Sequence, residues 1–390
     1  MDKTTKQITK QRLIGVELFR GVAAFGVVVI HADALMRYSG FPTDYWTVAF
    51  AEINRFAVPF FLAASFYFMT GKLYANVNHF PRGFNLKSKW KRLLVPYLCW
   101  SAIYLCLRLI KALSRSDGLT TLFQDPVGLI FLGGASIHLY FLPLLFLGSF
   151  LIVVPEYLVR RQKVNIKTIA FLWVFSILAY ELMYVSGNAF QFGSNCLENA
   201  SSCSVAFQSL LEAVLPNAKR NQVLRLILVA LSWLIQCLPY VFMTMGLNHP
   251  SLQKKLNSFD KKYLIFWIAL IIIFCVFWIF DVFKIIYFPR ALYEIGIALC
   301  LLIVSIYLSK AVRESWIIEN LGSCSFGIYL MHYLILVLYT TTGAKLSNEL
   351  LKASPIFTML ILATITFVTS WIITSLILPK KAVSRLLFGG

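Results

Sequence analysis

The chain has 390 residues, of which 59% are hydrophobic and only 14% are charged. This composition differs strongly from that of a soluble protein and predicts an all-α polytopic membrane protein, because backbone groups in lipid must be hydrogen-bonded within helices. The net charge of +19 does not indicate a nucleic-acid partner, since the basic residues concentrate on one side of the predicted spans. The expected partner of this surface is the lipid bilayer.

The apolar runs predict about ten transmembrane helices in one membrane domain, residues 13–378. With the N-terminus in the cytoplasm, every cytoplasmic segment carries positive charge, and most of the 36 lysines and arginines lie on that side. We therefore expect residues 1–12 and 379–390 to be cytoplasmic tails of a multi-pass protein in the cell (inner) membrane. The predicted spans cover about 13–33, 50–70, 93–113, 138–155, 167–186, 223–245, 262–281, 287–309, 322–341 and 355–378.

The first span carries ionisable residues along one stripe. Arg20 and His31 are eleven residues apart, so they lie on the same face of a helix, separated by about 16 Å along its axis. Glu17 lies one turn before Arg20 and can pair with it. Because a charged side chain in hydrocarbon is costly, this stripe is predicted to face protein or water.

Two outer segments are long. Residues 114–137 contain the run PVGLIFLGGA, which is too short to span and is either re-entrant or a cap over a cavity. Residues 187–222 contain Cys196 and Cys203, whose pairing in a disulfide depends on the compartment, and an amphipathic stretch at 204–217. The cysteine spacing contains no C-x-x-C pattern, and no metal site is predicted.

Further polar residues lie at membrane depth, and each is a candidate functional group. Arg290 and Glu294 are spaced i to i+4, which favours a buried ion pair that fixes helix packing. Arg55 lies near the predicted start of the second span, where it either reaches the interface or belongs to a site. The remaining candidates are Glu52, Asn54, His138, Tyr140, Glu181, Gln236, Tyr329 and His332.

Two histidines are predicted at the same membrane level. His31 ends the stripe of the first span, and His138 begins the fourth, so both lie toward the outer side. They form either an acid/base pair or a base and a substrate-binding residue. His332 in the ninth span fits a core role and a lining role equally. At the opposite side, the basic segment FPRGFNLKSKWKRLLVP reflects topology alone or binds the phosphates of a cytosolic ligand.

Five short motifs, in this order on a ten-span chain, resemble the integral-membrane acyltransferase-3 family. ELFRGVAAFGVVVIHA carries the family's arginine and histidine as Arg20 and His31. KWKRLLVPYLCW resembles its basic pair before a proline, as Lys89 and Arg92 before Pro96. The others are VPFFLAASFYF, with Phe66 where the family has glycine, HLYFLPLL, and SFGIYLMH.

The resemblance implies an enzyme that moves an acyl group, often acetyl, from acyl-CoA to hydroxyl groups of sugars and other acceptors. It implies catalytic roles for His31, Arg20 and Glu17, with His31 as general base or acyl carrier. Lys89 and Arg92, together with Arg20, would bind acyl-CoA, which acts as a co-substrate and not as a resident cofactor. The remaining implied residues bind the carbohydrate or lipid-linked sugar acceptor: His138, Tyr140 and His332.

Two other functions stay open from the sequence. A transporter of a glycan precursor or small molecule would also have ten helices with buried charges, although the hydropathy pattern contains no inverted repeat. An inactive scaffold would have no need for a charge in the bilayer, so Arg20 and His31 argue against it. Some relatives carry a soluble domain that completes transfer outside the cell. This chain acts alone, transfers on the cytoplasmic side, or needs a separate partner protein.

Overall fold

The computed structural model describes residues 13–38, 40, 43–75, 86–113, 125–161, 165–185, 222–257, 261–343 and 354–390. The predictions for Cys196, Cys203 and the amphipathic stretch 204–217 concern residues outside these ranges. The N-terminal segment 1–12 also lies outside them. All statements below concern the described residues.

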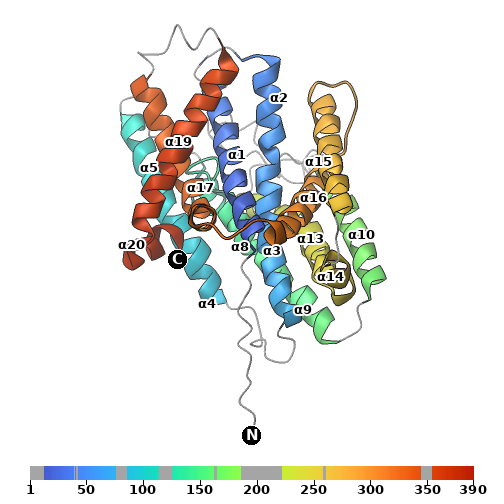
Figure 1. Cartoon of the computed structure of the whole chain (residues 1–390). Coiled ribbons are helices and arrows are strands. Elements are labelled where there is room, and N and C mark those ends of the chain that lie inside the picture. Colours follow the sequence, from blue (N-terminus) through green and yellow to red (C-terminus); the bar gives the residue numbers. More distant parts are fainter. Residues whose placement is uncertain are drawn as a thin grey trace.

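The described residues contain ten helices that are long and apolar enough to cross a membrane, and none of these residues forms a strand. These helices match the ten predicted spans in order, which confirms the all-α polytopic fold. Figure 1 labels the elements. They are α1 (Ile14–Tyr38), α2 (Tyr45–Ile53), η1 (Asn54–Phe56), α3 (Ala57–Ala75), α4 (Leu86–Lys89), η2 (Trp90–Leu94), α5 (Val95–Leu113), α7 (Pro126–Phe131), α8 (Phe141–Gly148), η3 (Ser149–Ile152), α9 (Val153–Arg160), α10 (Ile166–Val185), α13 (Gln222–Leu247), α14 (Pro250–Asn257), α15 (Lys261–Val282), α16 (Arg290–Ala311), α17 (Trp316–Gly343), α19 (Pro355–Ile377) and α20 (Lys381–Phe388).

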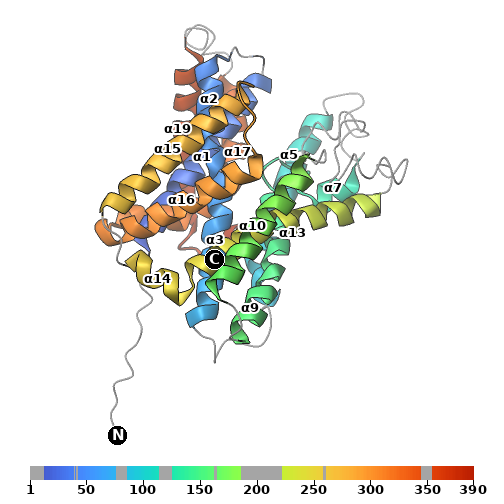
Figure 2. The same cartoon turned by 90° about the vertical axis from the view of Figure 1, so that its right-hand side faces the viewer.

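The long helices form one bundle around the span made by α2, η1 and α3. α1 packs against α17 and α19, and α10 packs against α13. Figure 2 shows α15, α16 and α19 on one side of α3 and α10 and α13 on the other side. α3 contacts α1, α13 and α16, so it connects the two halves of the bundle. Its buried side chains, such as Phe60 and Phe66, lie in the main apolar core.

Prolines interrupt three of the spans. Pro59, Pro96 and Pro155 have no N–H to donate to the carbonyl four residues earlier, so the turn before each must change its hydrogen bonding. The chain forms the 3₁₀ turn η1 before Pro59, the π turn η2 before Pro96 and the 3₁₀ turn η3 before Pro155. Irregular turns of this kind are often found at functional sites.

The second span begins earlier than the predicted residue 50. Asp44 caps α2 by accepting a hydrogen bond from the Thr47 backbone N–H at 2.7 Å. The hydrogen bonds from Thr47 lower the pKa of Asp44. The span therefore begins at Tyr45, and Glu52 and Arg55 lie well inside it and not at its start. This changes the interpretation of Arg55, which was expected near an interface.

The short apolar run at 126–135 and the C-terminal segment also pack against the bundle. The run forms the short helix α7, which begins at the Asp125 cap and is too short to span. At the other end of the chain, α20 packs against α5. Trp100 Nε1 of α5 donates a hydrogen bond to the Leu387 carbonyl at 2.9 Å, and Phe388 is buried. Much of segment 379–390 is thus a packed helix.

Candidate active site

Three histidines from three separate elements meet inside the bundle. His31 comes from α1, His138 from the segment between α7 and α8, and His332 from α17. The ring centroids of His31 and His138 are 6.0 Å apart, those of His31 and His332 are 5.1 Å apart, and those of His138 and His332 are 4.8 Å apart. The structure therefore brings together the two histidines predicted at one level and adds His332. We call these residues the histidine cluster.

Close packing of α1 on α17 places His31 beside His332. Gly322 of α17 lies directly against the Glu17 side chain, and Gly21 of α1 lies directly against Leu321. A side chain at either glycine would meet these neighbours, so the helices approach as closely as they do because both positions lack a Cβ.

A tight turn positions His138. Gly133 adopts a positive φ of 81°, and its backbone N–H donates to the Tyr97 hydroxyl at 3.1 Å. Arg108 Nη1 of α5 donates to the Gly134 carbonyl at 2.7 Å. These bonds fix the segment to α5, so that its next residues turn inward and bury His138.

Hydrogen bonds define the tautomer of His138. Its Nε2 lies 3.3 Å from the Leu330 carbonyl, which can only accept, so Nε2 carries a proton. Its Nδ1 lies 3.0 Å from Ser136 Oγ, and in the neutral ring Nδ1 accepts from that hydroxyl. The Tyr329 hydroxyl donates to the His138 backbone carbonyl. Both ring nitrogens of His138 are thus occupied.

His332 has the opposite arrangement. Its Nδ1 lies 2.6 Å from the Tyr329 carbonyl and must donate to it, which leaves Nε2 of the neutral ring with a lone pair. Among the described residues, Nε2 has no hydrogen-bond partner although it is buried. A buried base without a partner is unusual and needs an explanation. His31 is half-buried, and it is the only member of the cluster that is not fully buried.

Tyrosines surround the histidine cluster. Tyr104 of α5 lies edge-on to His138 at 5.2 Å, and Tyr333 of α17 lies edge-on to His31 at 5.8 Å. The sequence interpretation did not select Tyr104, Tyr333 or Ser136. Ser136 precedes His138 by two residues, a spacing that suits a local hydrogen bond, whereas the contact of Tyr104 depends on the tertiary packing of α5.

Arg20 and Glu17 lie away from the histidine cluster. They form an ion pair at 3.2 Å on α1. Because α1 is one continuous helix, the separation of eleven positions from Arg20 to His31 corresponds to about 16 Å along its axis. The predicted pairing is confirmed, but the structure does not bring Arg20 to His31.

Lys89 and Arg92 lie at the beginning of the third span, in α4 and η2. Lys89 Nζ lies 3.0 Å from Met69 Sδ of α3, and Lys89 lies within electrostatic range of Arg92 and Lys72. The Arg92 side chain is exposed. The basic residues of this segment therefore gather at one end of the bundle, near the lower end of α3 in Figure 1.

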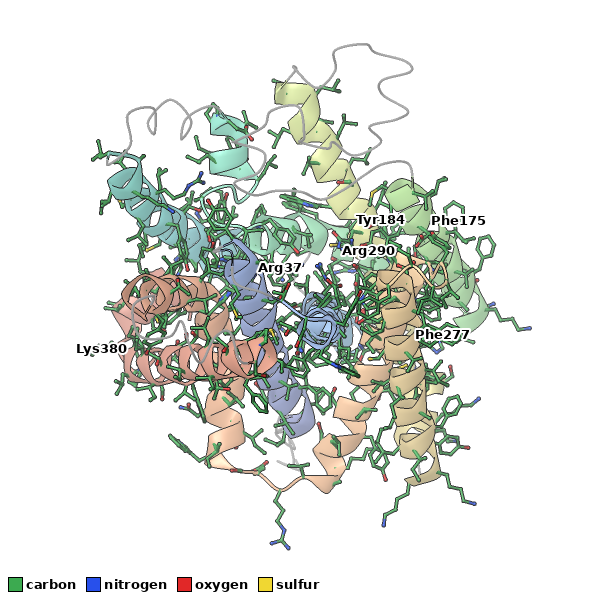
Figure 3. The ribbon with its side chains drawn as sticks, turned by 90° about the horizontal axis from the view of Figure 1, so that it is seen from above. Arg37, Phe175, Tyr184, Phe277, Arg290 and Lys380 are labelled. Atoms are coloured by element: carbon green, nitrogen blue, oxygen red, sulfur yellow. The ribbon has the colours of Figure 1, made fainter. Side chains whose placement is uncertain are left out.

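A second polar cluster connects α10 with α16. Arg290 Nε donates to Glu294 at 2.8 Å, and Arg290 Nη1 donates to the Tyr184 hydroxyl at 3.0 Å. The Tyr180 hydroxyl donates to the other oxygen of Glu294 at 2.7 Å. Figure 3 shows Arg290 and Tyr184 side by side where the two helices meet. The predicted ion pair of Arg290 and Glu294 is confirmed, and it joins two spans.

Glu181 extends this cluster. Its carboxylate accepts from the Ala291 backbone N–H at 2.7 Å and from the Tyr287 hydroxyl at 2.9 Å. The hydrogen bond to Glu181 raises the pKa of Tyr287, in the loop before α16, to about 12. Tyr140 is within electrostatic range of Glu294 and Arg290 and also of Tyr329, so it lies between this cluster and the histidine cluster.

The histidine cluster is not arranged as a metal site. Within the described ranges, no group of three or more His, Cys, Asp or Glu residues could hold a metal ion. The tautomers agree with this, because Nε2 of His138 and Nδ1 of His332 carry protons directed at carbonyl oxygens. The arrangement instead provides a half-buried imidazole beside a buried lone pair, in a low-dielectric surrounding suited to proton transfer.

The ten candidate spans found in the described ranges, packed around a buried group of histidines and tyrosines, indicate a multi-pass membrane protein with a candidate acid/base site. A family model described as an acyltransferase domain matches residues 13–375, nearly the whole chain. The chain therefore belongs to the acyltransferase-3 family of membrane acyltransferases. No curated protein and no solved structure gives a significant match.

Proposed function

We propose that this protein transfers an acyl group, most simply acetyl, from cytosolic acyl-CoA to a hydroxyl of a cell-surface or lipid-linked carbohydrate. The enzyme would work in the cell membrane, with no permanently bound cofactor. The observation that carries the proposal is the position of the half-buried His31 ring, whose centroid lies 5.1 Å from that of His332. His332 Nε2 has no hydrogen-bond partner among the described residues. Family membership favours acyl transfer over transport.

In the proposed reaction, an imidazole takes the proton of the acceptor hydroxyl while the hydroxyl oxygen attacks the thioester carbonyl. The tetrahedral intermediate then collapses, the carbon–sulfur bond breaks, and the proton passes to the leaving thiolate to give CoA-SH and the ester. His31 is the base in this scheme because it is the accessible member of the cluster. An acyl-imidazole on His31 is the second form of the same proposal.

The acyl-CoA phosphates are assigned to the basic end of the third span. Lys89 is half-buried and Arg92 exposed, and cations of this kind suit phosphate groups. Arg20 and Glu17 lie between this end and the histidine cluster along α1, where Arg20 can contact the pantetheine arm or its carbonyl groups. Tyr140 and His138 are assigned to the acceptor.

The test uses the full chain purified in lipid nanodiscs with radiolabelled acetyl-CoA and a membrane glycan extract. Labelled product and stoichiometric CoA-SH would support the proposal. The same protein in sealed vesicles tests the transport alternative directly. Accumulation of labelled substrate inside the vesicles without release of CoA-SH would exclude acyl transfer. Acid quenching separates the two roles of His31, since only an acyl carrier retains label on the protein.

Mass spectrometry of surface glycans from cells with and without the gene identifies the acceptor and the acyl group. Loss of one acyl mass from a defined sugar is the expected result. Glycans that are identical in both strains, combined with an unchanged lipid fraction, would contradict a carbohydrate acceptor.

A further inference from the structure

Arg20, the arginine that was expected to act together with His31, does not lie at the histidine cluster. When a hydroxyl attacks a thioester, negative charge develops on the carbonyl oxygen, and preorganised donors stabilise it strongly. Arg20 lies about 16 Å from His31 along α1 and is paired with Glu17. Another donor is needed if the charge develops beside His31, and an arginine closer to His31 would supply one.

Arg55 lies in the irregular turn of the central span. η1 contacts both α1 and α16, so it lies between them inside the bundle. A Cβ at Gly26 of α1 would be only 3.0 Å from Asn54 Oδ1, which shows how closely this turn approaches α1. Pro59, four residues after Arg55, accounts for the irregular backbone here.

The surroundings of Arg55 show which way its side chain faces. The side chain is 42% exposed, while the preceding residue, Asn54, is buried. Seen from above, the span that carries Arg55 stands end-on in the middle of the bundle, between α1 and α16 (Figure 3). Arg55 is within electrostatic range of His31, Tyr140 and Tyr293, from α1, from the segment before α8 and from α16. These three groups belong to elements packed around η1, so Arg55 lies on the part of its span that adjoins His31.

Glu52 holds the guanidinium in place. Its Oε2 lies 2.5 Å from Arg55 Nε, and the Glu52 side chain is only 12% exposed. This contact uses Nε, whereas Nη1 and Nη2 supply the remaining N–H donors of the guanidinium. An arginine fixed by one edge in this way is preorganised to bind an oxygen anion through its other edge.

We propose that Arg55, and not Arg20, binds the carbonyl oxygen of the acyl group and stabilises its negative charge during transfer. The inference rests on the proposed function. The hydroxyl oxygen bonds to the acyl carbon, the carbonyl electron pair moves onto the oxygen beside Arg55, and the thiolate leaves when that pair returns. Arg55 exchanges no proton in these steps.

The experiment measures kcat and KM for acyl-CoA in nanodiscs for Arg55→Gln, Arg55→Lys and the wild type. Arg160→Gln is the matched control, because Arg160 pairs with Glu156 at 2.7 Å with a similar exposure of 36% and 12%, but at the far end of its span. We expect Arg55→Gln to lower kcat about 10²-fold to 10³-fold with little change in KM. Arg55→Lys should recover part of kcat, and Arg160→Gln should match the wild type.

The outcomes separate the inference from the proposed function. If the wild type transfers acyl groups and folded Arg55→Gln keeps kcat within about threefold, the role of Arg55 is excluded while the proposed function stands. An equal loss in Arg160→Gln would also exclude it, since the loss would then come from a general effect of removing arginines. If Arg55→Gln does not fold, Arg55→Lys decides, because a folded lysine variant with wild-type kcat and raised KM would assign Arg55 to binding alone. A wild type without acyl transfer would overturn the proposed function itself.

Discussion

The histidine cluster and the cluster of Arg290 and Glu294 differ in how completely their hydrogen bonds are satisfied. In the cluster of Arg290 and Glu294, both carboxylate oxygens and two guanidinium nitrogens have partners. In the histidine cluster, His138 is fully bonded, but His332 keeps a buried lone pair on Nε2. A closed network stabilises a fold, whereas an open one leaves a group available for a reaction.

The two clusters also differ in the elements that they join. Arg290 and Glu294 lie on α16 and reach tyrosines of α10, so they fix one pair of spans. The histidine cluster needs α1, α17 and the turn before α8 together. A site that depends on three separate elements is formed only in the complete bundle, as expected for catalysis and not for helix pairing.

Removing the accessible histidine should have the largest effect. We expect His31→Ala to lower kcat about 10³-fold, because it removes the group that takes the acceptor proton. His249→Ala is the control, since His249 lies in the loop after α13 and pairs locally with Ser251. Full transfer by a His31→Ala protein at normal membrane levels would contradict the site assignment.

The next largest effect is expected at His332. Asn at this position can keep the donor to the Tyr329 carbonyl while it removes the basic nitrogen. If the free Nε2 takes part in proton transfer, His332→Asn lowers kcat about 10²-fold with an unchanged melting temperature. A loss of thermal stability without a loss in kcat would instead make His332 a packing residue.

In the closed cluster, a change should affect stability and leave catalysis intact. Glu294→Gln leaves the Arg290 charge without its carboxylate, and removing one partner of a buried pair destabilises strongly. Because the Arg290 side chain is 32% exposed, we expect a smaller cost of about 2 kcal/mol. The melting temperature should fall, while kcat per folded molecule stays at the wild-type value. A lower kcat at full stability would place Glu294 in the reaction and remove the contrast between the clusters.

Much of this fold could be predicted from the sequence, because span length and the i to i+4 ion pair are local features. The three-histidine arrangement could be predicted only in part. His31 and His138 share a predicted level, but the position of His332 depends on how α17 rotates against α1. That rotation follows from contacts at Gly21 and Gly322, which no local pattern reveals.

Arg55 shows how a boundary affects a functional interpretation. A span starting at residue 50 places Arg55 near the interface, whereas the Asp44 cap moves the start to Tyr45 and places Arg55 deep in the bundle. The cap signal, Asp44 with Thr47 three residues later, is visible in the sequence. Hydropathy alone misses it because Tyr45 and Trp46 suit the membrane interface as well as a helix.

The smallest effect is expected at His138, and it provides the most specific comparison within the cluster. Gln can keep the Nε2-type donor to the Leu330 carbonyl, so His138→Gln should lower kcat less than about fivefold if His138 helps to hold the acceptor and takes no part in proton transfer. The same assay is expected to give a loss of kcat of about 10²-fold for His332→Asn, so the two variants can be compared directly with each other. Because the two rings lie 4.8 Å apart, a general disturbance of the site would affect both variants equally. A large loss in His138→Gln with native stability would instead assign its ring to proton transfer, and the tautomers inferred from Leu330 and Tyr329 would then be wrong.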